Sequence, residues 1–214
     1  MRNMLNFPKS TDVRRIVPKE RFYEKEPSKI KEYFVTHIEK IIWANKISPT
    51  TLNISSKAYP ELQVFEIYLK SVDKKLNDVI RLIDSKIPYP ILFLLICKNE
   101  IKAILSFKQI KEEKIVIIEQ IECNWQDLEN FKLELKGNSV DTIYENYLYQ
   151  IEPSLHFTEN LEDNIDKYKQ IKVLRAEIEK INRKIKNEPS IAKGQELARK
   201  RNSLEDEIKN IQIT

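Results

Sequence analysis

Glycine and long apolar runs are scarce in this sequence, and each scarcity excludes a class of protein. Only 2 of the 214 residues are glycine, which argues against a glycine-rich phosphate loop and against collagen-like repeats. The longest apolar run covers Ile91 to Cys97, far short of the ~20 residues that a membrane-spanning helix needs. Residues 1–9 also lack the apolar stretch of a secretory signal peptide. The sequence therefore predicts a cytoplasmic protein that does not cross a membrane.

Cysteine and histidine are equally scarce, and they form no metal or redox motif. Cys97 and Cys123 lie in apolar patterns typical of strands, without a CxxC pair, so we expect buried thiols. His37 shares a predicted helix face with Phe34 and is expected to be a satisfied core histidine, whereas His156 lies in a linker. No metal ion or cofactor is predicted from these residues.

Charge is plentiful, and it is distributed unevenly along the chain. Charged residues make up 33% of the sequence, hydrophobic residues make up 41%, and the net charge is +4. Residues 1–30 contain 8 Lys or Arg against 4 acidic residues, and residues 161–214 contain 13 against 10, whereas residues 31–160 contain 16 against 19. Basic ends of this kind favour contact with a polyanion.

The composition divides the chain into four expected segments. Proline residues interrupt any helix near the start, and apolar anchors there indicate an arm that lies on the domain surface. The length suits one globular domain with an appendage. The expected segments are a basic N-terminal arm (1–28), an α+β globular domain (29–153), a linker (154–160) and a C-terminal helical hairpin (161–214).

The globular domain is expected to contain a mixed β-sheet of about four to five strands with packed helices. Apolar spacing predicts a helix from Ser28 to the residue before Ser48, and a further helix over 73–85. Alternation over 128–135 predicts either a strand or a short helix. The predicted strands are Leu62 to Lys70, Ile91 to Cys97, Ile101 to Phe107 and Lys114 to Cys123, and a last domain helix is expected from about Asn138 to Ile151.

The C-terminal segment carries the clearest pattern in the chain. Its apolar residues recur at alternating steps of three and four, which is the spacing of a coiled-coil seam. Asn187, Glu188 and Pro189 interrupt the pattern. We therefore expect two helices folded into an antiparallel hairpin, with a seam that closes either within one chain or between two chains. The seam residues are Ile171, Leu174, Ile178, Ile181, Ile185, Leu197, Leu204, Ile208 and Ile211.

The strand around Glu66 is the main candidate for catalysis. Glu66 and Lys70 are an even number of residues apart, so a regular strand would place both on one face. An acid and a lysine on one strand face are similar to the core of restriction-type nucleases, in which carboxylates bind Mg²⁺. Glu122 joins them if its strand is adjacent. A plain ion pair or a solvated strand edge is the alternative, and Mg²⁺ is expected only if the nuclease interpretation holds.

Two basic clusters are the candidate nucleic-acid-binding residues, because lysine and arginine neutralise phosphates. One cluster lies in the N-terminal arm. The other lies at the hairpin tip, where four of the five charges between Arg183 and Lys193 are positive. A solvated surface is the alternative for both clusters. The candidates are Lys9, Arg14, Arg15, Lys19, Arg21, Arg183, Lys184 and Lys186.

Aromatic residues that stack on bases need basic neighbours on the same surface. In the sequence, only Phe107 beside Lys108 meets this condition locally, with Lys111 and Lys114 nearby. Core packing is the expected role of the other aromatic residues.

Several motifs resemble a family described as a domain of unknown function, DUF4391. They are Asn6 to Thr11, Ile16 to Tyr23, Val64 to Ile67, Ile83-Asp84 with Ile87 to Phe93, Ile143 to Asn146, and the charged hairpin. The resemblance covers nearly the whole chain. It implies no catalytic residues, but it does imply a setting, because such proteins look like companions of helicases and DNA methyltransferases in bacterial defence or restriction-modification loci.

The sequence and this resemblance together favour a non-catalytic accessory subunit. It is expected to bind DNA or a helicase-like or methyltransferase partner through the basic arm and the hairpin. Two alternatives remain open. One is a Mg²⁺-dependent nuclease that uses Glu66 and Lys70, and the other is a homodimer whose hairpins pair between chains without a role in DNA binding.

Overall fold

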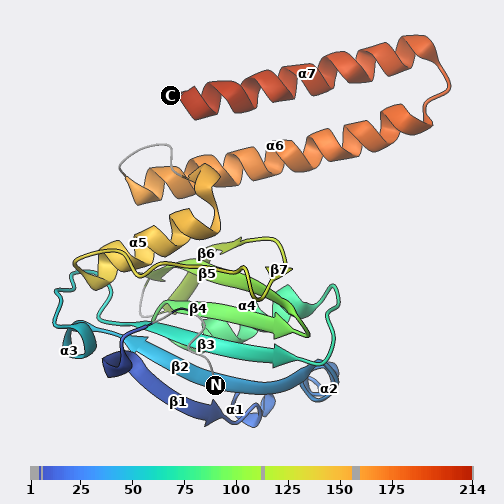
Figure 1. The fold of residues 1–214 in the computed structure, drawn as a ribbon. Coiled ribbons are helices and arrows are strands. Elements are labelled where there is room, and N and C mark those ends of the chain that lie inside the picture. The colour runs from blue at the N-terminus through green and yellow to red at the C-terminus, as the bar shows by residue number, and fades with distance from the viewer. Residues whose placement is uncertain (1–4, 6, 112–113, 156–159, 214) are drawn as a thin grey trace. The chain divides into compact units, whose positions relative to one another are not determined.

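The computed structural model of the protein describes residues 5, 7–111, 114–155 and 160–213. The chain forms two compact units, Met1–Pro153 and Ser154–Thr214. The first unit has the α+β class that the sequence predicts, and the second consists mainly of two long helices (Figure 1). No helix among the described residues is long and apolar enough to span a membrane.

The first unit is built on a mixed sheet with the strand order β1-β2-β3-β4-β5-β6, and β7 also pairs with β5. Only β3 and β4 run parallel, and the other neighbouring strands pair antiparallel. The strands are β1 (Asp12–Val17), β2 (Ile38–Ile47), β3 (Leu62–Leu69), β4 (Ile91–Cys97), β5 (Glu100–Lys111), β6 (Lys114–Glu122) and β7 (Gln126–Asp127).

Helices connect and cover these strands. One of them, α4, links the parallel strands β3 and β4, the crossover that a parallel pair requires. The helices are α1 (Glu20–Tyr23), α2 (Ser28–His37), α3 (Pro49–Leu52), α4 (Leu76–Ser85), α5 (Val140–Ile151), α6 (Leu161–Asn187) and α7 (Ile191–Ile213), with short 3-10 turns η1 (Lys9–Thr11) and η2 (Pro153–Leu155).

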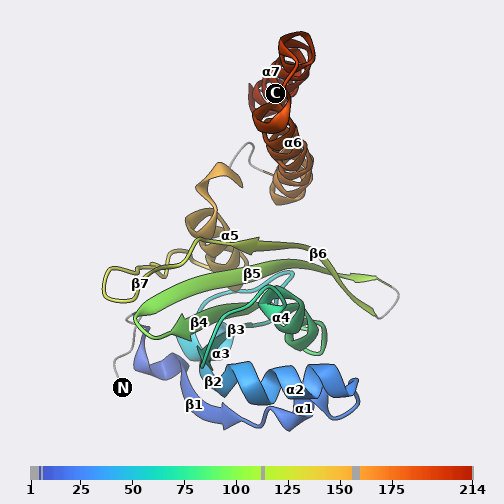
Figure 2. The same cartoon turned by 90° about the vertical axis from the view of Figure 1, so that its right-hand side faces the viewer.

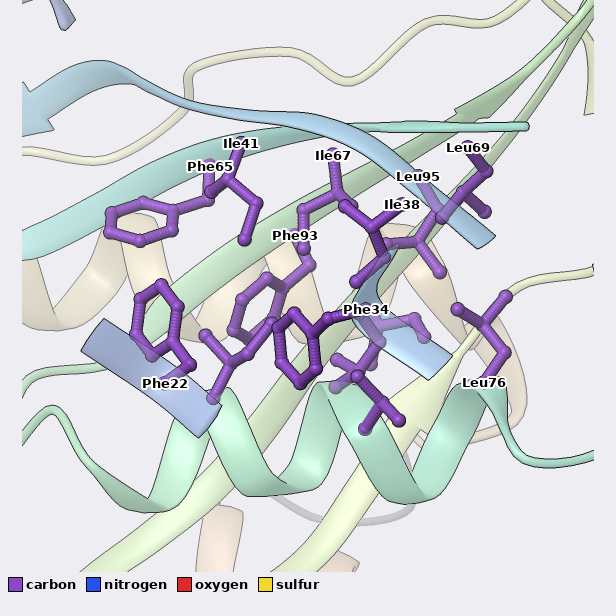
Figure 3. Packing of buried hydrophobic residues seen from close by; sticks show 14 of the residues in the cluster. Phe22, Phe34, Ile38, Ile41, Phe65, Ile67, Leu69, Leu76, Phe93 and Leu95 are labelled. Atoms are coloured by element: carbon purple, nitrogen blue, oxygen red, sulfur yellow. The ribbon is translucent and has the colours of Figure 1, made fainter. Parts of the chain in front are cut away.

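One face of the sheet packs against α1, α2 and α4 through a buried apolar cluster (Figure 3). Alternate residues of each strand point to this face, as the pleat requires. Phe65 of β3 and Phe93 of β4 meet edge to face with their ring centroids 6.1 Å apart. Phe34 of α2 is fully buried in the same cluster. This face forms the main core of the unit.

The opposite face of the sheet is covered by α5, which lies over β5 and β6 (Figure 2). Its Tyr144 is fully buried, and the phenol oxygen donates a hydrogen bond of 2.9 Å to the backbone carbonyl of Ser106. Tyr147 of α5 packs edge to face against Phe7. The central strand β4 is therefore covered on both sides, which agrees with its continuous apolar sequence.

The predicted helix from Ser28 to Ser48 is wrong in its second half. The helix α2 ends at His37, and residues Ile38–Ile47 form strand β2. The register of β2 against β3 shifts twice, between Ile38 and Lys40 and between Trp43 and Asn45. Each bulge breaks the alternation of a regular strand, so the apolar residues fall at spacings of three and four that also fit a helix.

The predicted irregular arm over residues 1–28 is also wrong in part. Residues Asp12–Val17 form the edge strand β1, which pairs antiparallel with β2. A register shift near Arg14, where φ is +50, interrupts the pairing. With β1 and β2 added, the sheet is wider than predicted. Residues 128–135 form neither of the predicted elements, although Phe131 and Leu133 are buried there.

The second unit confirms the predicted helical hairpin. Helices α6 and α7 pack against each other within one chain. The Lys200 ammonium forms an ion pair of 2.7 Å with Glu177 on the facing helix. Asn160 caps α6 by accepting a hydrogen bond from the backbone N–H of Asp163. The predicted seam residues are buried or half-buried, while most of their neighbours are exposed.

Replacing Gly137 by alanine is expected to destabilise the first unit by about 1–3 kcal/mol. Its φ of +140° is strained for an alanine, and a Cβ there would lie 2.6 Å from Thr142 Oγ1 and 2.8 Å from the backbone nitrogen of Ile143. Urea unfolding followed by circular dichroism measures the change.

Gly194→Ala is the matched control, since Gly194 lies in α7 and nothing lies within 4 Å of its added Cβ. Alanine is the better helix former, so this change is expected to stabilise the hairpin by about 0.5–1 kcal/mol. Equal effects of the two substitutions would contradict the geometry at Gly137.

Candidate functional site

The three candidate catalytic residues have separate surroundings. Glu66 is buried on β3 and accepts hydrogen bonds from Arg14 at 2.7 Å and from the hydroxyl of Tyr68 at 3.1 Å. Burial and the Glu66 carboxylate raise the pKa of Tyr68 to about 12, which keeps this hydroxyl protonated as a donor. Glu66 is therefore fixed by an ion pair and a phenol.

Lys70 and Glu122 do not join Glu66. Strand β3 ends at Leu69, and the Lys70 ammonium donates to the carbonyl of Val35 on α2 at 2.9 Å. Glu122 accepts from Asn77 on α4 at 2.8 Å and pairs with Lys102 at 3.1 Å. Glu66 alternates with core residues that face α4, so it lies on the other face of the sheet. The prediction that Glu66 and Lys70 share one face is wrong for this reason.

Among the described residues, no group of three or more His, Cys, Asp or Glu side chains could hold a metal ion. His37 is half-buried at the end of α2, where it stacks on Tyr33 and lies 2.8 Å from the hydroxyl of Ser71. Cys97 is buried and Cys123 is half-buried, and both are free thiols. His156 lies outside the described residues.

Two of the basic residues predicted to bind nucleic acid have internal partners. The guanidinium of Arg14 is paired with Glu66. The Lys19 ammonium donates hydrogen bonds to the carbonyl oxygens of Ile38 at 2.7 Å and Phe34 at 3.3 Å. Burial lowers the pKa of Lys19, and repulsion from Lys70 lowers it further. Both side chains hold the N-terminal segment to β2 and β3. A phosphate would have to compete with these contacts.

The other predicted basic residues are exposed. Arg183 lies 3.5 Å from Glu179 on the same helix. Within the described part of the chain, no ion pair involves the remaining five, which are Lys9, Arg15, Arg21, Lys184 and Lys186. They are available to a partner.

The structure also contains a cavity of about 410 Å³ at one end of the main core. Its floor includes Phe22 of α1 and Phe65 of β3, which lie next to each other in Figure 3. The half-buried rings of Trp43 on β2 and Tyr89 in the loop before β4 form part of its walls. The indole N–H of Trp43 donates to the carbonyl of Asn45 at 3.1 Å, which restrains the ring.

Polar residues complete the lining of this cavity. Gln63 is buried in the lining, and Glu61, Lys86 and Arg21 lie around it. Glu61 accepts from the Gln63 amide nitrogen and pairs with Lys46. Gln63 lies on β3 and Glu61 just before it, Lys86 lies in the α4–β4 loop, and Arg21 lies on α1.

The loop that carries Lys86 and Tyr89 is held by a buried lysine. Lys108 is 4% exposed, and its ammonium donates hydrogen bonds to the carbonyl oxygens of Asp84, Ile87 and Tyr89 at 2.9, 3.0 and 2.9 Å. It also lies 2.6 Å from the Asp84 carboxylate. Burial raises the pKa of Asp84 and lowers that of Lys108, and their mutual attraction opposes both shifts.

Phe107, the one aromatic residue with basic neighbours in the sequence, is therefore a core residue and does not lie on a basic surface. The side chains of Phe107 and Lys108 are both buried, because a bulge in β5 at this pair directs the Lys108 ammonium to α4. The side chains of Lys111 and Lys114 lie outside the described residues. The structure instead brings Trp43 and Tyr89 together with Arg21 and Lys86. Arg21, Trp43 and the segment that holds Lys86 and Tyr89 are far apart in the sequence, so no local pattern indicated this combination.

Lys108→Met is expected to lower the free energy of unfolding by about 3–5 kcal/mol, because the buried Asp84 carboxylate would lose its counter-charge. Lys102→Met is the matched control on the same strand, where the ion pair with Glu122 is more exposed. It is expected to change stability by less than about 1 kcal/mol. Urea unfolding of both variants is the measurement, and equal losses would contradict a structural role for Lys108.

Comparison with known proteins identifies a family for this chain. The match to the family described as "Domain of unknown function (DUF4391)" covers residues 5–208. No match was found among curated proteins or among solved structures. Because the match covers nearly the whole length, including both structural units, the chain belongs to the DUF4391 family.

Proposed function

We propose that this chain is a non-catalytic accessory subunit of a bacterial genome-defence or restriction-type system. In this proposal it binds DNA, and a helicase-like or methyltransferase partner, through exposed basic residues of the N-terminal segment and through the helical hairpin. The observation that carries the proposal is the excess of positive charge at the turn of the hairpin.

Charges along the hairpin are balanced differently at its turn and along its length. Away from the turn, several lysine and arginine residues pair with acids, as in Lys169 with Asp166 and Arg201 with Glu205. Near the turn, Lys184, Lys186 and Lys193 are exposed and take part in no ion pair with a described residue. Unpaired lysines are suited to contact phosphates, because they lose no internal pair when they do so.

A hollow of about 650 Å³ lies between the two helices at this turn. Its lining is more basic than acidic, which supports contact with an anionic surface. The charged residues of the lining are Arg183, Lys184, Lys193 and Lys200, with Glu188 and Glu196.

Lys184→Gln combined with Lys186→Gln is expected to weaken DNA binding and to reduce its salt dependence. If each lysine contacts one phosphate of a duplex, the slope of log Kobs against log salt becomes less negative by about 1.8. Fluorescence anisotropy with a labelled duplex at several salt concentrations, with Mg²⁺ present, measures both quantities.

Lys167→Gln combined with Lys209→Gln is the control, because it removes the same amount of charge from the hairpin at positions away from the turn, one on α6 and one on α7. An equal loss in the control would show that only overall charge matters. Failure to retain any DNA at low salt would contradict the DNA-binding part of the proposal. Shortened DNA after incubation would contradict the non-catalytic part.

A further inference from the structure

The cavity beside Trp43 and Tyr89 has the composition of a small-molecule site. Its volume of about 410 Å³ falls within the range of roughly 300–1,000 Å³ that is typical of such sites. Its floor is apolar and buried, and two half-buried aromatic rings stand in its walls. Planar ligands gain most from surfaces of this kind, because flat rings stack with large contact area.

The cavity is also held in shape by contacts outside it. Lys108 fixes the loop that carries Tyr89 through three carbonyl oxygens. An ion pair of 2.7 Å between Lys86 and Glu26 ties the same loop to the segment after α1. A lining that is already ordered loses less entropy when a ligand binds.

Among the described residues, the ion pairs around the cavity do not include the cation Arg21. Lys86 pairs with Glu26, and Glu61 pairs with Lys46. The Arg21 guanidinium is exposed and forms no ion pair with any residue that the structure describes. The surroundings therefore favour a ligand that carries a negative group, and a guanidinium is well suited to a phosphate.

The lining contains an acceptor that is not satisfied. The Gln63 amide nitrogen donates to Glu61, so its amide oxygen faces away from that carboxylate. This oxygen is buried and accepts no hydrogen bond from the described residues. Buried acceptors without a donor are costly, and the exocyclic amino group of a base would supply one.

We propose that this cavity binds a single nucleotide, with the base against the rings of Trp43 and Tyr89 and the phosphate at Arg21. Aromatic walls, an unpaired guanidinium and an unmet acceptor together match the three parts that a nucleotide offers. The nucleotide comes either from solution or from a single strand of nucleic acid. This site is separate from the hairpin, so it does not depend on the function proposed above.

The test is calorimetric titration of the full chain with dCMP, dAMP and a short single-stranded oligonucleotide. Tyr89→Leu removes one stacking ring, and Arg21→Ala removes the cation. Loss of one base-stacking ring is expected to weaken binding roughly 5- to 150-fold. The controls are Trp125→Phe, which changes an aromatic residue packed on the same core outside the cavity, and Lys25→Ala, which removes an exposed charge outside it.

The site is supported if the protein binds the mononucleotides, if Tyr89→Leu and Arg21→Ala both weaken this binding, and if the controls leave it unchanged. This result would identify the ligand as a free nucleotide. Binding of the oligonucleotide alone, with the same dependence, would support a nucleotide within a strand. Absence of binding to either, or equal effects of site and control variants, would overturn the proposal. The hairpin lysine variants are expected to leave mononucleotide binding unchanged.

Gln63→Leu tests the contact to the base. The wild-type protein is expected to bind dCMP about 2- to 10-fold more tightly than dTMP, because thymine has no exocyclic amine. The variant is expected to lose this preference while it still binds both. Equal affinities for dCMP and dTMP in the wild-type protein would overturn the role given to Gln63.

Discussion

The buried contact between Lys108 and Asp84 determines how β5 packs against α4 and the turn that follows it. Lys108 lies on β5, and Asp84 lies at the end of α4. Of the three carbonyl oxygens around the ammonium, one is that of Asp84 and two belong to the turn into β4. This turn closes the only parallel connection among the described strands of the sheet. Since an unpaired charge in such a site is strongly destabilising, the pair holds the crossover in one position.

The same contact has a consequence for the surface. The turn that Lys108 fixes carries Tyr89 and Lys86, which line the cavity next to Trp43. Lys86 pairs with Glu26 and Lys46 pairs with Glu61 around this cavity, whereas Arg21 forms no ion pair with a residue in the described part of the chain. The first unit thus presents an ordered, partly aromatic site, whereas the hairpin presents exposed lysines on two simple helices. In the two proposals these surfaces contact different parts of a nucleic acid, the cavity a single base and the hairpin the phosphates of the backbone.

Much of the fold could be predicted from the sequence wherever one regular pattern covers an element. The apolar run of β4 and the stripe of α4 are such cases, and both elements are found. Strand β2 could not be recognised, because two bulges shift its apolar residues out of strict alternation. Of the candidate site residues, Arg14 and Lys19 are predicted from charge to contact phosphates, whereas in the structure they bind Glu66 and backbone carbonyl oxygens. Charge alone does not reveal which partner is nearest in space.

The sequence by itself determined the α+β class and the C-terminal hairpin, since coiled-coil spacing is a local property of each helix and survives in any context. The tertiary structure decided that the hairpin closes within one chain. It also decided where the cavity lies, because its lining residues Arg21, Trp43, Gln63 and Tyr89 come from separate segments. These segments meet only after β1, β2 and β3 pair and Lys108 positions the turn before β4. Contacts between distant segments depend on register and burial, and neither property can be read from the spacing within one segment.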